Sequence, residues 1–87
     1  MKVTTGHGHM IVNFDEGRLK GSTVKFHGEP CADNMLGIYG WSGEIIEPTK
    51  RKLTLEEFEY VKEAVLKYYE TSTSKRKIQF GSYEMKR

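Results

Sequence analysis

The chain has 87 residues, a length that fits one small domain with a thin hydrophobic core. Hydrophobic residues make up 37% and charged residues 30% of the sequence, which is typical of a globular protein and excludes a disordered chain. No apolar stretch reaches the length of a membrane-spanning helix, and none follows Lys2 as it would in a secretory signal peptide. The single cysteine, Cys31, cannot form an internal disulfide, so we expect a cytoplasmic protein that does not contact membranes.

The net charge of +2 is unevenly distributed along the chain. Residues 1–49 carry four Lys or Arg against six Asp or Glu, whereas residues 50–87 carry ten against six. The basic excess lies in two clusters, Lys50-Arg51-Lys52 and Lys75-Arg76-Lys77. Such clusters bind phosphates in nucleic-acid-binding proteins, but lysines also solubilise the loops that flank helices. Charge alone therefore favours a solvated surface, with nucleic-acid binding as the alternative.

Alternating apolar residues predict strands in the first half of the chain. Residues 2–5 form a short first strand, and residues 9–28 form a hairpin around the turn Asp15-Glu16-Gly17. We expect Gly28-Glu29-Pro30 to end this hairpin, because proline cannot donate to the ladder of a central strand.

A third long strand is predicted over residues 35–41. If the alternation holds, Leu36 and Ile38 lie on one face of this strand, and Tyr39 and Trp41 lie on the other.

The best-defined element is a helix at about residues 54–70. Thr54 is a good N-cap, and Glu57 three residues later completes a capping box. Leu53 before the cap is placed to meet Phe58 as a hydrophobic staple. The apolar face predicted from three- and four-residue steps consists of Leu55, Phe58, Val61, Val65 and Tyr68.

Shorter strands are expected at residues 45–46 and 77–82. Because the strands cluster before the helix and one follows it, the sequence predicts an α+β fold and not alternating βαβ units. We expect a single domain over residues 1–87, with a small, mostly antiparallel sheet and one helix packed on one face.

The three histidines and the cysteine are numerous enough to form a metal site, but their spacing does not favour one. His7 and His9 share a face if they lie on a strand, and His27 and Cys31 are the further candidate ligands. Their spacing fits no structural zinc pattern, and exposed histidines in a glycine-rich turn explain the residues better. We therefore expect no bound metal.

Catalytic chemistry has little support in the sequence. No third group orders Cys31 with a histidine, and the pairs Asp15-Glu16 and Glu56-Glu57 are explained by a turn and a helix start. The glycines match neither a phosphate-binding loop nor a dinucleotide fingerprint. We expect a protein that is not an enzyme, has no catalytic residues and needs no cofactor.

The segment around Trp41 favours protein recognition. Aromatic side chains ringed by carboxylates suit the binding of a basic protein partner. The competing interpretation of Trp41, as a plain core residue, explains it equally well. The candidate partner-binding residues are Asp33, Tyr39, Trp41, Glu44 and Glu47.

Dispersed runs resemble a known family along nearly the whole chain. The runs Met1-Lys2-Val3-Thr4, Gly8 to Phe14 and Lys25-Phe26-His27-Gly28-Glu29 resemble the opening of the immunity protein 74 family of bacterial polymorphic-toxin and contact-dependent-inhibition systems. The second half of that family, an aromatic-and-proline stretch, a capped helix and a final strand, is similar to Trp41, Ile46-Glu47-Pro48, Leu53-Thr54-Leu55-Glu56-Glu57, Val61 and Lys77-Ile78-Gln79-Phe80.

The resemblance implies an immunity protein that binds and neutralises a cognate toxin domain by blocking its active site or its access to substrate. The alternative from a different class is a small single-stranded nucleic-acid-binding module that uses Tyr39, Trp41 and the two basic clusters.

Overall fold

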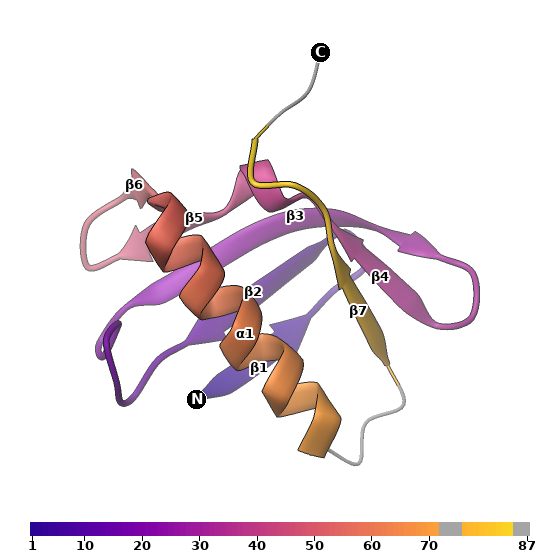
Figure 1. Cartoon of the computed structure of the whole chain (residues 1–87), viewed down its shortest axis with the longest axis horizontal. Coiled ribbons are helices and arrows are strands. Elements are labelled where there is room, and N and C mark those ends of the chain that lie inside the picture. Colours follow the sequence, from indigo (N-terminus) through magenta and orange to yellow (C-terminus); the bar gives the residue numbers. More distant parts are fainter. Residues whose placement is uncertain (72–75, 85–87) are drawn as a thin grey trace.

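The longest strand, β3 (Thr23–Cys31), has neighbours along both of its edges. The computed structural model in Figure 1 describes residues 1–71 and 76–84. Along the chain, the other elements are β1 (Lys2–Thr5), β2 (His9–Asn13), β4 (Met35–Ile38), the 3-10 turn η1 (Gly40–Ser42), β5 (Glu44–Glu47), β6 (Arg51–Lys52), α1 (Leu55–Thr71) and β7 (Lys77–Phe80).

The sheet is mostly antiparallel. β1, β2 and β3 follow one another as antiparallel neighbours, and β2 pairs with one edge of β3. The other edge of β3 is shared, because β4 pairs with its second half and β5 with its first half. β6 extends the sheet beyond β5, and β7 pairs with β4 in parallel. With α1 lying across one face of this curled sheet (Figure 1), the predicted α+β fold is confirmed.

The hydrophobic core lies between the sheet and α1. Phe26 of β3, Phe58 of α1 and Phe80 of β7 meet at ring-centroid distances of 5.5 to 6.3 Å. The strands contribute the buried side chains Met10, Val12, Val24, Phe26, Leu36, Ile38 and Ile45 to this core. The helix contributes Phe58, Val61 and Val65. The opposite face of the sheet carries no helix in the described part of the chain (Figure 1).

The prediction that Gly28-Glu29-Pro30 ends the hairpin is wrong. β3 continues to Cys31, and Pro30 lies opposite Leu36 of β4. Proline is tolerated there because the pairing with β2 stops at His27, so one edge of β3 is free at Pro30.

The helix matches its prediction closely. The capping box forms, since the Thr54 amide donates to Glu57 Oε1 at 2.9 Å and the Glu57 amide donates to Thr54 Oγ1 at 3.2 Å. Leu53 and Phe58 are both buried, as a hydrophobic staple requires. Of the Thr71-to-Ser74 run that follows, residues 72–74 lie outside the described residues.

Two members of the predicted apolar face of the helix are not buried. Leu55 is 52% exposed and Tyr68 is half-buried. In the first turn the inward position belongs to Glu57, whose carboxylate accepts two hydrogen bonds of 2.7 Å from the guanidinium of Arg51.

In the part of the chain that the structure describes, no helix combines the length and the apolar character needed to cross a bilayer.

Phe58→Ala should lower the free energy of unfolding by about 3–5 kcal/mol, because it removes a 3% exposed ring from the centre of the core. Urea unfolding monitored by circular dichroism measures the change. Glu63→Ala on the exposed side of the helix is the control, and an equal effect of the two substitutions would show that the helix packs through another face.

The Glu57 carboxylate makes the helix start sensitive to acid. Hydrogen bonds from Arg51 and the Thr54 amide lower the pKa of Glu57 from 4.5 to about 2. Since the folded-state pKa is depressed, the stabilisation is complete above pH 4.5 and is lost as the pH falls toward 2.

Glu57→Gln should therefore cost about 2 kcal/mol at pH 7 and progressively less between pH 4.5 and 2, measured by urea unfolding across that range. Glu56→Gln, which breaks an exposed 3.2 Å ion pair with Arg18, should cost about 0.5 kcal/mol or less. A Glu57→Gln penalty that does not depend on pH would contradict the assigned ion pair.

Candidate functional site

The five predicted partner-binding residues follow one edge of β3 as a row. Asp33 lies in the turn between β3 and β4, while Tyr39 and Trp41 lie at η1, near the middle. Glu44 and Glu47 lie on β5, opposite Lys25 and Thr23 at the start of β3. Since β3 has nine residues, the row is about 26 Å long. The structure thus brings Tyr39 and Trp41 together and leaves Asp33 and Glu47 at opposite ends.

Tyr39 and Trp41 do not project from a strand as predicted. β4 ends at Ile38, and Gly40–Ser42 form a 3-10 turn. The two rings stack with their centroids 5.4 Å apart and their planes inclined by 12°. Trp41 is 37% exposed and Tyr39 is half-buried, so the pair presents an aromatic surface and is not part of the core. The interpretation of Trp41 as a plain core residue is therefore wrong.

Ser42 and Gly40 hold this turn in place. Ser42 Oγ donates to the Tyr39 carbonyl at 2.6 Å and accepts from the His27 amide of β3 at 2.9 Å. Gly40 is buried, and a Cβ there would collide with the carbonyl oxygens of Gly81 and Ser82. The turn is thus fixed to β3 on one side and to the segment after β7 on the other.

Glu29 is the functional candidate that the sequence reasoning missed. Its carboxylate lies beside the Tyr39 phenol and raises the pKa of Tyr39 above its ordinary value, first through a hydrogen bond, with burial and charge adding to the effect. The sequence analysis ended the hairpin at Gly28-Glu29-Pro30, so it did not assign Glu29 to a face of the strand. Had the strand been continued, the period of two from Lys25 through His27 would have placed Glu29 on the same face.

A small hollow opens next to Tyr39, at Gly37 of β4. Gly37 lies directly between Glu29 of β3 and Gln79 of β7 in the strand register. We call this hollow the Gly37 notch. It has a volume of about 180 Å³ and is lined by Glu29, Gly37, Ile38, Tyr39, Gln79, Phe80 and Gly81.

The carboxylates farther along the row have different surroundings. Glu44 is half-buried and lies between two lysines, with Lys25 opposite it on β3 and Lys52 opposite it on β6. Glu47 is exposed at the end of β5. Opposite charges across a sheet stabilise each other, so Glu44 is balanced within the fold, whereas Glu47 is available to a partner.

Two residues of the first basic cluster, Arg51 and Lys52, make contacts with other residues of the same chain. Arg51 binds Glu57, and Lys52 Nζ lies 5.0 Å from the centroid of the Tyr83 ring. In the second cluster, Lys75 lies outside the described residues. These contacts favour a structural role for Arg51 and Lys52 over a phosphate-binding one.

The histidines do not converge with Cys31. His9 and His27 are direct partners across β2 and β3, but Cys31 lies four residues farther along β3, about 13 Å away. Within residues 1–71 and 76–84, no three His, Cys, Asp or Glu side chains are arranged to hold a metal ion.

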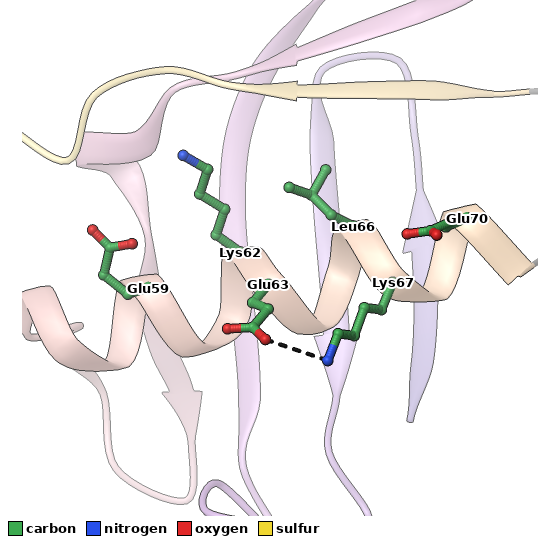
Figure 2. Close-up of a pocket in the computed structure, with 6 residues that line it drawn as sticks. All are labelled: Glu59, Lys62, Glu63, Leu66, Lys67 and Glu70. Carbon is green, nitrogen blue, oxygen red and sulfur yellow. Dashed lines mark ion pairs between the residues drawn. The ribbon is translucent and has the colours of Figure 1, made fainter.

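The outer face of α1 offers another hollow, of about 350 Å³, around Leu66, which is 40% exposed (Figure 2). Its rim alternates acidic and basic side chains, and Lys67 pairs with Glu63 at 3.3 Å. This mixture of charges is typical of a solvated helix surface. The rim consists of Glu59, Lys62, Glu63, Lys67 and Glu70.

Comparison with known proteins finds no matching family model, no matching curated protein and no matching solved structure. The interpretation of the site therefore depends on its own geometry and chemistry.

Gly40→Ala should disturb the aromatic surface, because the added methyl group meets backbone oxygens that cannot rotate away. We expect a loss of about 1–3 kcal/mol in urea unfolding and a shift in the fluorescence of Trp41, the only tryptophan in the chain. Gly8→Ala, whose Cβ would lie 3.4 Å from the Gly28 carbonyl, is the milder control. Trp41 emission that is unchanged in Gly40→Ala would contradict the described turn.

Proposed function

We propose that this protein is a bacterial immunity protein that acts in the cytoplasm. It binds a cognate toxin domain, such as a nuclease, and blocks the active site or the access of substrate. It performs no catalysis of its own and uses neither a cofactor nor a metal. The resemblance of its sequence to immunity proteins suggested this function, and the surface around Tyr39 and Trp41 is the structural observation that carries it.

That surface has the features of a binding hot spot. Tryptophan and tyrosine contribute most to affinity when a rigid scaffold holds them ready, because little side-chain entropy is lost on binding. Here the two rings are already stacked, and Ser42 and Gly40 fix their turn. Glu29 and Glu47 add negative charge along the same edge of β3. A toxin domain that normally binds phosphate would present the complementary positive charge.

The nucleic-acid alternative has weaker support. Stacked aromatic rings on an open sheet are also used to bind single strands. Yet the charged group beside Tyr39 is the carboxylate of Glu29, which repels phosphate, and Arg51 is paired with Glu57. Both contacts favour a basic protein over a polyanion as the partner.

The test is titration with a catalytically inactive toxin domain encoded next to the gene of this protein, monitored by calorimetry. We expect a nanomolar dissociation constant and rescue of growth when the active toxin is co-expressed. Trp41→Ala should weaken binding about 30-fold, equivalent to about 2 kcal/mol. Leu66→Ala on the outer face of α1 is the matched control and should leave the affinity unchanged.

The same titration with Glu44 and Glu47 both changed to alanine tests the β5 end of the row. Unchanged affinity and unchanged salt dependence would remove these two carboxylates from the interface. If the toxin does not bind and a single-stranded RNA does, with affinity falling steeply as salt rises, the immunity function is wrong.

A further inference from the structure

The Gly37 notch is a gap in a row of side chains. Outward positions on neighbouring strands normally carry side chains side by side, but Gly37 carries none between Glu29 and Gln79. The flanking strands β3 and β7 are two strand spacings apart, about 9.6 Å. A flat group a few ångströms wide fits between these two side chains with a hydrogen bond on each side.

The walls of the notch carry a carboxylate, a side-chain amide and an aromatic ring. Glu29 offers a carboxylate, Gln79 offers an amide oxygen, and the Tyr39 ring borders the notch on the side of η1. Among the residues that the structure describes, no lysine or arginine lines it; Lys77, the next outward residue of β7, lies opposite Met35, one row away. A cation is therefore the complementary occupant.

We propose that the Gly37 notch receives one arginine side chain of the protein partner. The guanidinium lies over Gly37, donates to the Glu29 carboxylate and to the Gln79 amide oxygen, and packs against the Tyr39 ring. This inference depends on the proposed function only in assuming that the partner is a protein.

Arginine fits this site better than lysine. A guanidinium is planar and carries five donors, so it reaches acceptors on two sides while its flat surface contacts a ring. The ammonium group of lysine is compact and strongly hydrated, and it would have to lose water to fill a notch bounded by separate acceptors. Glu29 and Tyr39 both line the notch, so a guanidinium bound to this carboxylate also reaches the ring.

The notch can be tested with the protein alone. The probe is the peptide acetyl-Gly-Gly-Arg-Gly-Gly-amide, titrated into the ¹⁵N-labelled protein, with shifts of the Glu29, Gly37 and Tyr39 amides as the readout. We expect millimolar binding that is about fivefold weaker when citrulline, the neutral isostere, replaces arginine, as the loss of about 1 kcal/mol implies. Lysine in the same peptide should also bind more weakly than arginine.

Two variants of the protein locate the binding. Glu29→Gln removes the charge and keeps the shape, and it should abolish the preference for arginine over citrulline. Gly37→Val should fill the notch and remove the shifts. It should still fold, because a Cβ there meets the rotatable Cys31 Sγ at 3.3 Å and a β-branched residue suits a strand. Glu16→Gln, the same charge change in the turn after β2, is the matched control.

Equal binding of the arginine, lysine and citrulline peptides, or full binding to Glu29→Gln, would overturn the proposal. Shifts clustered elsewhere on the protein would overturn it too. The outcome is separable from the immunity function. If the toxin domain binds the wild type, Glu29→Gln and Gly37→Val equally, the notch assignment fails and toxin binding stands. If the arginine peptide binds and the toxin does not, the immunity function fails and the notch assignment stands.

Discussion

The shared edge of β3 is the constraint on which the rest of the structure depends. A strand of nine residues offers more hydrogen-bonding groups than either β4 or β5 can use, so both strands pair with the same edge. The chain must therefore turn between them opposite His27, and Ser42 closes that turn onto the backbone of β3. Tyr39 and Trp41 lie at this turn, so the edge that organises the sheet also carries the exposed aromatic pair.

In the described part of the chain, the two faces of the sheet differ in whether a helix covers them. α1 covers one face, and its start is stabilised by an ion pair between the half-exposed Arg51 and the buried Glu57. Removing Arg51 would cost more than the pair contributes, because the buried Glu57 carboxylate would lose its charged partner. No helix within residues 1–71 and 76–84 covers the other face, and the outward positions of β3, β4 and β7 meet there around Gly37.

Local patterns predicted most of the fold but not the details of the site. The capping box at Thr54 and Glu57 and the alternation in β2 depend on neighbours in the sequence, so they could be found without a structure. The path of β3 through Pro30 could not, because it depends on which edge of the strand is free. Because the strand was predicted to end there, Glu29 was not recognised as a site residue. The 3-10 turn at Gly40 was missed for a similar reason, since it depends on the shared edge of β3 and on the close approach of residues 81 and 82.

Of the predicted site residues, Tyr39 and Trp41 form one surface, whereas Asp33 and Glu47 lie at the two ends of the row. Spacing along the sequence could not distinguish these cases, because the row follows β4, η1 and β5 through two changes of direction. The gap that Gly37 leaves between neighbouring side chains could not be predicted for the same reason. A glycine in a strand indicates close approach or a gap, and only the register with Glu29 and Gln79 shows which.

Hydrogen–deuterium exchange with and without an inactive toxin domain tests the binding surface most directly. The account predicts that the toxin slows exchange in residues 27–31 and 37–43, which form η1 and its neighbours on β3 and β4. Slower exchange confined to residues 59–70 of α1, with no change at η1, would contradict it.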